Sequence, residues 1–377
     1  MRISIVTGFF LPVPPVAGGA MEKIWFRLAR EFVRAGHTVT HFSRTWPGFP
    51  LQESIDGIAM VRLPGFNHTT SLWRNLSLDF IWGLKVMRRL PPGDIVVCNT
   101  VSMPVFLSAL KPRAGRVAVI LGRMPKGQIR LYGRVDRLVA TSEAVYAEVV
   151  RERPGMAART RTIVNPIDWH LHQAAKAKAA DRVRIGYVGR INPEKGLEIL
   201  IDAAVELAGR PGLPPWSLVI TGPQGIAQGG GGPAYVEELR RRASAAGGRI
   251  SIEPPVYDVA ALARIYGGLD IFCYPSLAEK GEGLSVAPIE AMAAGAVPVL
   301  SELDCYRDLI RPGINGFYFN HRAPDRSSQL ASVLGQLVAD PALRARIAAQ
   351  ACTDSRSFDY GAVADALLKD FRVLTEG

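Results

Sequence analysis

Strand-like and helix-like segments alternate along almost the whole chain, and this alternation limits the fold more than any other feature. Short apolar runs read as buried parallel strands, and helical patterns of apolar residues separate them. Such alternation is typical of doubly wound α/β domains. The expected strands are 3–6, 94–98, 116–121, 137–140, 184–188, 217–221, 250–253 and 270–274, and the expected helices include 20–34, 144–151, 197–204, 259–266 and 286–294.

Size and composition indicate two globular domains. The 377 residues exceed what one hydrophobic core usually supports. With 48% hydrophobic and 21% charged residues, and no apolar run near the ~18 residues of a membrane span, we expect a soluble or peripheral protein. Gly8 and Pro12 interrupt the apolar N-terminus, so we expect no signal peptide there. The four cysteines are scattered without C-x-x-C pairs, which favours reduced thiols in a cytoplasm.

Two glutamates flank the start of an apolar helix in the second half of the chain. Glu282 and Glu290 are eight residues apart. A helix that begins near Val286 would place them about 12 Å apart. This is roughly the span from the hexose to the ribose of a nucleotide-diphosphate sugar. The helix N-terminus between them favours phosphate through its free N–H groups and dipole.

Two cations flank an expected strand-to-helix loop upstream. Arg190 and Lys195 follow the strand 184–188 and precede the helix 197–204, so we expect both on an exposed loop. Open α/β sheets bind ligands at the carboxyl ends of their strands. Two fixed cations at such a place can neutralise a diphosphate leaving group without a divalent metal.

In this order and spacing, the two pairs resemble the retaining glycosyltransferases of family 4, which have the GT-B fold. The resemblance covers nearly the whole chain. It implies two Rossmann-like, doubly wound parallel-sheet domains that face a central cleft. Residues 1–170 would form an acceptor-binding domain and residues 171–359 a nucleotide-sugar-binding domain, with 173–180 as a linker and the C-terminal helix 360–377 crossing back to the first domain. Further segments similar to the family are 3–6, 12–15, 18–22, 35–40, 274–276, 296–299 and 315–317.

The resemblance also implies a role for each site residue. Glu290 would bind the donor ribose, and Glu282 would contact the transferred sugar. Glu279 is the alternative to Glu282, because many relatives carry the first glutamate there. Arg190 and Lys195 would stabilise the departing diphosphate. Backbone groups would contact the phosphates at Gly18 and Gly19 in the first domain and at Gly283, Leu284 and Ser285 in the second, although Ser285 replaces the more usual glycine.

One position departs from the family. Many relatives carry a histidine after a strand in the middle of the first domain, near the acceptor and the sugar. The corresponding positions here are Cys98-Asn99-Thr100 and Leu121-Gly122-Arg123. We therefore take Asn99, Arg123 and Lys126 as candidate contacts for an acceptor or the diphosphate. Solvated loop cations are the competing interpretation of Arg123 and Lys126.

The resemblance predicts transfer of a sugar, with retention at the anomeric carbon, from a nucleotide-diphosphate sugar to a saccharide or lipid-linked saccharide. Segments 11–22 and 123–128 point to bacterial surface or spore-coat polysaccharide. We expect no cofactor and no metal, since the chain has no Asp-x-Asp triplet. A catalytically reduced nucleotide-sugar-binding protein is the alternative. A nicotinamide dehydrogenase is disfavoured because no G-x-G-x-x-G follows the relevant strands.

The positive charge lies almost entirely in the first half of the chain. Residues 1–180 hold 25 Lys and Arg against 11 Asp and Glu, whereas residues 181–377 hold 20 against 23. No nucleic-acid-binding signature accompanies this excess, so we expect an anionic membrane or a diphosphate-linked lipid as partner rather than nucleic acid. A peripheral place on the inner face of the cell membrane would fit.

An amphipathic helix is predicted over Ser71–Leu90. The competing interpretation packs its apolar side against the sheet of the first domain. The apolar side is formed by Trp73, Leu76, Phe80, Leu84 and Met87, and the nearby cations are Arg74, Lys85, Arg88 and Arg89.

Overall fold

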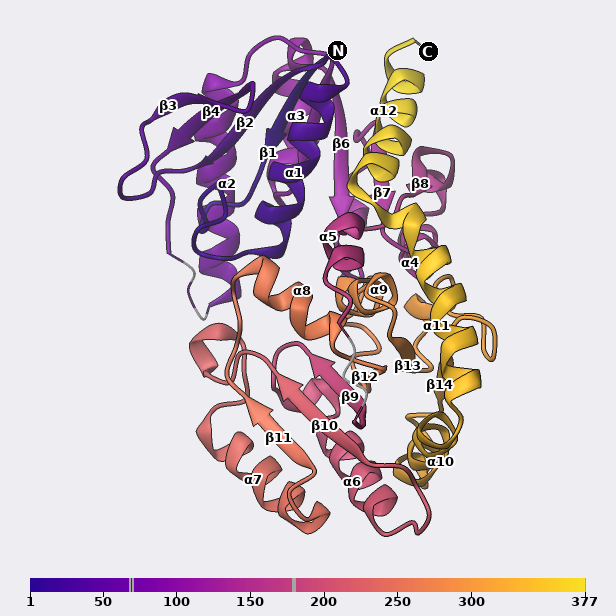
Figure 1. Ribbon diagram of the computed structural model, residues 1–377. Coiled ribbons are helices and arrows are strands. Elements are labelled where there is room, and N and C mark those ends of the chain that lie inside the picture. Colours follow the sequence, from indigo (N-terminus) through magenta and orange to yellow (C-terminus); the bar gives the residue numbers. More distant parts are fainter. Residues whose placement is uncertain (68, 70, 178–180, 377) are drawn as a thin grey trace. The chain divides into compact units, whose positions relative to one another are not determined.

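The computed structural model describes residues 1–67, 69, 71–177 and 181–376. The chain folds into two compact units, which are described separately here (Figure 1). Unit 1 comprises Met1–Pro166 and the C-terminal segment that begins at Tyr360, and unit 2 comprises Ile167–Asp359. The predicted boundary at residue 170 therefore falls inside α5 (Trp169–Ala174), the first helix of unit 2. The predicted linker 173–180 begins within that helix, and its residues 178–180 lie outside the described residues.

Unit 1 is built on an eight-stranded sheet in the order β3-β4-β2-β1-β5-β6-β7-β8. All neighbouring strands are parallel except β3 and β4, which pair antiparallel. The chain leaves β1 toward β2 and later returns to β5 on its other side, so the order reverses between β1 and β5. The strands are β1 (Arg2–Val6), β2 (Thr38–Arg44), β3 (Gln52–Ile55), β4 (Ile58–Leu63), β5 (Ile95–Cys98), β6 (Arg116–Leu121), β7 (Arg137–Ala140) and β8 (Thr160–Thr162).

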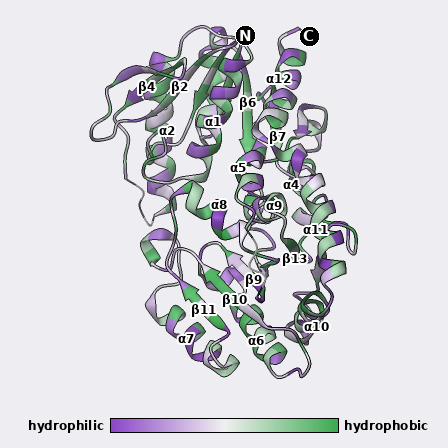
Figure 2. Cartoon of the chain, viewed as in Figure 1, coloured by the Kyte–Doolittle hydropathy of each residue, from purple (hydrophilic) through white to green (hydrophobic). Residues whose placement is uncertain are grey.

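Helices cover both faces of this sheet, because successive strand residues point to opposite faces. On one face, α1 (Ala20–Arg34) and the C-terminal helix α12 (Tyr360–Glu376) pack together over Ile95 and Val97. On the other, α2 (Leu72–Arg89), α3 (Met103–Leu110) and α4 (Glu143–Glu152) cover Val96 and Cys98. Figure 2 shows strands of both sheets mostly in the hydrophobic colour, while the helices carry both colours.

The C-terminal helix α12 belongs to unit 1 through both apolar and charged contacts. The rings of Phe371 and Phe32 on α1 lie 6.2 Å apart, centroid to centroid. The Arg137 guanidinium pairs with the Asp370 carboxylate at 2.8 Å, and both side chains are buried.

The apolar side predicted for the helix at 71–90 is for the most part not the side that packs. The buried residues of α2 are Asp79, Trp82, Gly83 and Val86, and from the predicted side Met87 packs against the same core as a partly buried residue. The competing interpretation, in which the whole predicted side packs against the sheet, is therefore wrong. Trp73 and Phe80 are 80% and 46% exposed. The Trp82 indole donates to the backbone oxygen of Thr7 at 3.1 Å, which anchors the buried side at the end of β1.

Unit 2 contains a fully parallel six-stranded sheet in the order β11-β10-β9-β12-β13-β14. Its order reverses between β9 and β12, where ligands bind in open α/β sheets. Because parallel neighbours need crossover connections, helices separate most of its strands along the chain. The remaining elements are β9 (Val183–Val188), β10 (Trp216–Thr221), β11 (Ile250–Glu253), β12 (Ile271–Tyr274), β13 (Val297–Ser301), β14 (Phe317–Phe319), α6 (Leu197–Ala208), α7 (Pro233–Ala243), α8 (Val259–Gly267), α9 (Val286–Ala293), α10 (Arg326–Ala339) and α11 (Pro341–Ser355).

Candidate active site

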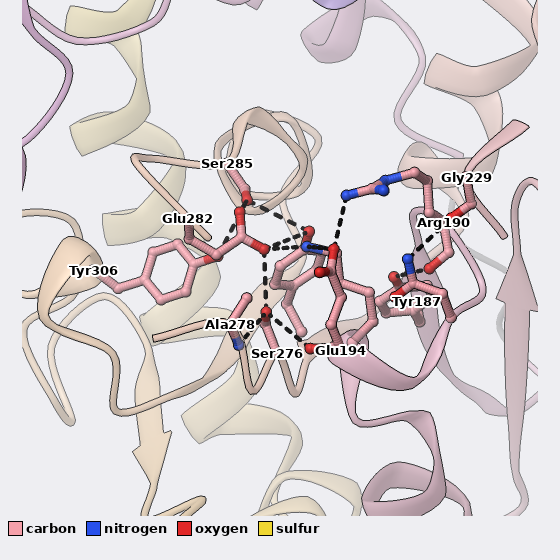
Figure 3. A network of polar contacts seen from close by, with 12 residues as sticks. Tyr187, Arg190, Glu194, Gly229, Ser276, Ala278, Glu282, Ser285 and Tyr306 are labelled. Carbon is pink, nitrogen blue, oxygen red and sulfur yellow. Dashed lines mark hydrogen bonds and ion pairs between the residues drawn. The ribbon is translucent and has the colours of Figure 1, made fainter. Parts of the chain in front are cut away.

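The loop after β9 holds Arg190 at the point where the strand order of unit 2 reverses. The Tyr187 hydroxyl donates to the Arg190 backbone oxygen at 2.8 Å (Figure 3). The Arg190 guanidinium lies 2.8 Å from the Glu194 carboxylate, and its side chain is 42% exposed. Arg190 thus combines a fixed backbone with a guanidinium that remains partly open to solvent.

A glycine-rich loop packs against this segment, which the sequence did not reveal. In this loop, residues 229–232, the backbone N–H of Gly231 donates to the Ile191 oxygen at 2.8 Å, and the Asn192 amide donates to the Gly229 oxygen at 2.9 Å. A Cβ at Gly229 would lie 3.0 Å from the Arg190 side chain, so the absence of a side chain allows this approach.

Lys195 and Glu282 form a buried ion pair. They are only 4% and 8% exposed, so the expectation that Lys195 lies on an exposed loop is wrong. Burial alone would lower the pKa of Lys195, but Tyr274 and Glu282 raise it above its usual value. Burial likewise acts to raise the pKa of Glu282, but the Lys195 charge and hydrogen bonds hold it below its usual value. Both groups are therefore charged near neutral pH.

Two serine hydroxyls donate directly to the Glu282 carboxylate, and a tyrosine hydroxyl donates to one of these serines (Figure 3). The Ser276 hydroxyl donates to Oε1 at 3.1 Å, and the Ser285 hydroxyl donates to Oε2 at 2.6 Å. The Tyr306 hydroxyl donates to Ser285 Oγ at 3.2 Å. Ser276 follows β12 and Ser285 precedes α9, so the carboxylate lies at the same end of the sheet as Arg190. Sequence reasoning singled out neither Ser276 as a contact of Glu282 nor Tyr306.

Glu279 lies in a different ion-pair group. Its carboxylate receives two bonds from Arg322, both 2.7 Å long, and a contact of 2.9 Å from His321. These bonds lower the pKa of Glu279. Of the two alternatives, Glu282 is the one that contacts Lys195.

Glu290 is buried on α9 beside two residues that the sequence analysis did not identify. Its Oε1 lies 3.7 Å from Nε2 of His172 on α5. The Tyr266 hydroxyl donates to the Glu290 carboxylate, and burial together with the Glu290 charge raises the pKa of Tyr266 well above its usual value. Helix α9 begins after Ser285, whose side chain turns to Glu282 and does not cap the helix. Gly283 and Leu284 occupy the turn between the ion pair and this helix.

In unit 1, the Gly18-Gly19 turn leads directly into α1. Both glycines have positive φ, 83° and 98°. The positive φ of Gly19 favours glycine there, and a Cβ at this position would also force the carboxylate end of the Glu22 side chain to move. Glu22 itself is buried in the first turn of α1, and burial raises its pKa.

The other candidates in unit 1 follow β5 and β6. The Asn99 backbone N–H donates to Val6 of β1 at 2.9 Å, so Asn99 lies where the strand order of unit 1 reverses. Its side-chain amide has no hydrogen-bond partner among the described residues. Arg123 and Lys126 are exposed on the loop after β6, and Glu152 accepts from the backbone N–H of Gly127 in that loop at 2.6 Å.

Among residues 1–67, 69, 71–177 and 181–376, no group of three or more His, Cys, Asp or Glu is arranged to hold a metal ion. No described helix is both long enough and apolar enough to cross a membrane.

Each unit matches a known protein family. Residues 18–170 match the family described as Glycosyltransferase Family 4, and residues 171–353 match the Glycosyl transferases group 1. One relative is the D-inositol 3-phosphate glycosyltransferase of Rhodococcus opacus, 29% identical over 262 residues, which are 66% of this chain and 56% of the relative. Another is the phosphatidyl-myo-inositol mannosyltransferase of Mycobacterium tuberculosis, 28% identical over 190 residues, 50% of this chain and 46% of the relative. The chain thus matches about half the length of these relatives.

Two solved structures share the fold. Sucrose-phosphate synthase from Thermosynechococcus elongatus has a TM-score of 0.80 at 19% identity, over 99% of both chains. The Anabaena protein HepE, in complex with UDP and glucose, has a TM-score of 0.73 at 19% identity, over 99% of this chain and 100% of that one. Two parallel-sheet α/β units, two family matches and these structural neighbours together show that the chain belongs to the family 4 glycosyltransferases and has the GT-B fold.

Proposed function

We propose that the protein transfers a sugar from a nucleotide-diphosphate sugar to a saccharide or lipid-linked saccharide, with retention at the anomeric carbon. The main support is the buried Lys195–Glu282 ion pair, which lies with Arg190 at the point where the strand order of unit 2 reverses. This position is where open α/β sheets bind ligands. The pair offers a cation for a diphosphate and a carboxylate for sugar hydroxyls.

The charges support a division of roles. Lys195 stays protonated, so that Lys195 and Arg190 stabilise the negative charge that develops on the departing diphosphate. Preorganised charges of this kind contribute a few kcal/mol each to transition-state stabilisation. Glu282 stays ionised and accepts hydrogen bonds from the transferred sugar, while Glu290 accepts from the ribose. In unit 2, backbone groups at 283–285 are proposed to contact phosphate, and in unit 1 the backbone at Gly18 and Gly19 is proposed to do so.

We propose that transfer requires neither cofactor nor metal, because two cations already supply the charge that a divalent ion would supply. Activity should therefore survive EDTA. Complete loss with chelator, restored by manganese or magnesium, would contradict this assignment.

The acceptor side is proposed to lie in unit 1, with Asn99, Arg123 and Lys126 as contacts. The relatives named above act, by their names, on inositol phosphate and phosphatidylinositol, which are anionic. The basic excess of the first half of the chain would attract such an acceptor. The exposed Trp73 side of α2, with Arg74 and Arg88 nearby, would favour the anionic inner face of a cell membrane. A role in bacterial cell-surface polysaccharide synthesis would fit such a place in the cell.

One observation favours a second candidate, a nucleotide-sugar-binding protein without transfer. Asn99 lies in one of the two segments where the resemblance would place a histidine, and its side-chain amide has no hydrogen-bond partner among the described residues.

A panel of radiolabelled nucleotide sugars, with and without membrane extract, separates these candidates. Transfer of label that is lost in Lys195→Ala supports the proposal, and binding without transfer supports the second candidate. Proton NMR of the product then reports the anomeric configuration, and an inverted product would refute retention.

A further inference from the structure

The Glu282 carboxylate has few hydrogen-bonding positions left. An ionised carboxylate accepts about four hydrogen bonds, two on each oxygen. Lys195 and Ser276 occupy Oε1, and Ser285 occupies one position on Oε2. The Tyr274 hydroxyl, 3.5 Å from Oε1, is at the limit of a hydrogen bond. Among the described residues no other group bonds to Oε2, so one position on this oxygen remains for a ligand.

The direction of the Ser285 hydrogen bond follows from its neighbours. Tyr306 is fully buried, and burial raises its pKa well above the usual value, so its hydroxyl keeps its proton. That hydroxyl donates to Ser285 Oγ at 3.2 Å. The single proton of Ser285 has two acceptors within reach, Glu282 Oε2 at 2.6 Å and the Tyr274 hydroxyl at 3.4 Å. The carboxylate is nearer and charged, and 2.6 Å is typical of a hydroxyl that donates to a carboxylate, so the proton is directed to Oε2.

The Ser285 hydroxyl is held in this direction from two sides. Ser285 is the N-cap residue of α9, so its backbone is fixed by the helix. Tyr306 is fixed in turn, because its backbone oxygen accepts a bond from the Tyr318 hydroxyl. Rotation of the Ser285 hydroxyl away from Glu282 would exchange the 2.6 Å hydrogen bond to a carboxylate for the 3.4 Å contact with the Tyr274 hydroxyl.

We propose that Ser285 is a specificity-determining residue that limits Glu282 to one hydrogen bond from the transferred sugar. This inference rests on the proposed contact between Glu282 and that sugar. The ligand class is a nucleotide-diphosphate hexose, and the discrimination is between hexoses that differ in the presence or configuration of one hydroxyl. Without the Ser285 hydroxyl, Oε2 has two open positions and the carboxylate is free to turn toward either hydroxyl.

The test compares hexose donors that differ at one sugar hydroxyl, such as UDP-glucose, its C4 epimer UDP-galactose and UDP-6-deoxyglucose. Discrimination is measured as the ratio of kcat/KM for the best and second-best donor, and again as the ratio of their Kd values. Ser285→Ala should lower this ratio about tenfold, as expected for one hydrogen bond to a charged group. Ser285→Thr keeps the hydroxyl and should keep the wild-type ratio. Ser328→Ala is a matched control, because Ser328 donates to Glu206 at 2.7 Å on the exposed surface.

The contact itself is tested without catalysis by titrating the ¹³C-labelled Glu282 carboxylate, assigned with Glu282→Gln. The Ser285 hydrogen bond lowers the pKa of Glu282, so Ser285→Ala should raise it and Ser285→Thr should not. An unchanged pKa in Ser285→Ala, or an unchanged donor ratio, would overturn the inference. Equal loss of discrimination in the Ala and Thr variants would also overturn it, since the hydroxyl would then be irrelevant. Absence of transfer by the wild type would instead refute the proposed function, and the Kd ratios would still decide the role of Ser285.

Discussion

Replacement of Lys195 by alanine should destabilise unit 2 as well as abolish transfer. The substitution leaves the Glu282 carboxylate charged, buried and without its cation. Breaking a buried pair by removing one partner typically costs about 3–5 kcal/mol. Ser276 and Ser285 still donate to the carboxylate, at 3.1 and 2.6 Å, and continue to compensate part of its charge. We therefore expect the lower end of this range, about 3 kcal/mol.

Thermal unfolding followed by calorimetry measures this loss. For a unit the size of Ile167–Asp359, about 3 kcal/mol corresponds to a decrease in Tm of roughly 6–12 °C. The transition of unit 1 should not move. Arg241→Ala is a matched control that removes a cation from an exposed pair with Glu238, and it should leave both transitions within error.

The pH dependence of the free energy of unfolding gives a second test, because the direction of its change can be predicted. In the wild type the pKa of Glu282 lies below its unfolded value, so its stabilising contribution is present above about pH 4.5 and is lost as the pH falls further. In Lys195→Ala the burial effect is no longer opposed by the cation, so the pKa of Glu282 should lie above its unfolded value. The stability difference between the two proteins should then shrink as the pH falls from 7 toward 4.5.

Two results would refute this reasoning. One is a loss below about 1 kcal/mol, which is typical of an exposed ion pair. The other is a stability difference that grows on acidification. The double variant Lys195→Met/Glu282→Gln should be more stable than Lys195→Met alone, because it leaves no unpaired buried charge.

Three further predictions concern other parts of the chain. Arg190→Ala should lower turnover about 10²–10³-fold, the loss typical of one transition-state donor, with unchanged Tm in calorimetry, because Arg190 is partly exposed. Asp79→Ala should destabilise unit 1 by about 2–3 kcal/mol in urea unfolding, because the Asp79 carboxylate accepts bonds from the backbone N–H groups of Val101 and Ser102. Charge reversal of the α2 cations Arg74, Arg88 and Arg89 should abolish sedimentation with anionic vesicles at low salt. The control, charge reversal of Arg240, Arg241 and Arg242 on α7, should not.

Local sequence patterns predicted many of the strands and helices. The predicted strand 116–121 is β6 and the predicted helix 20–34 is α1, because a short apolar run and an apolar period of 3.6 residues both follow from local geometry. The hairpin of β3 and β4 was missed, although its turn is an Asp56-Gly57 pair with positive φ at both residues, a recognised hairpin signal. Its edge strand β3 is only partly buried, which weakens the apolar pattern.

The sequence by itself also placed Arg190 and Glu282 after strands of one sheet. Residues that follow parallel strands gather at one edge, so order and spacing sufficed for this prediction.

Only the tertiary structure decided how these groups pair and how deeply they lie. Lys195 and Glu282 are 87 residues apart, and they meet because β9 and β12 are neighbours in the sheet. His172 reaches Glu290 from α5, and α2 buries Trp82 rather than Trp73. The spacing of apolar residues along the chain does not predict these contacts or which side of α2 is buried. The burial of a charge depends on a partner that only the assembled sheet supplies, and the buried side of a helix depends on the surface that it meets.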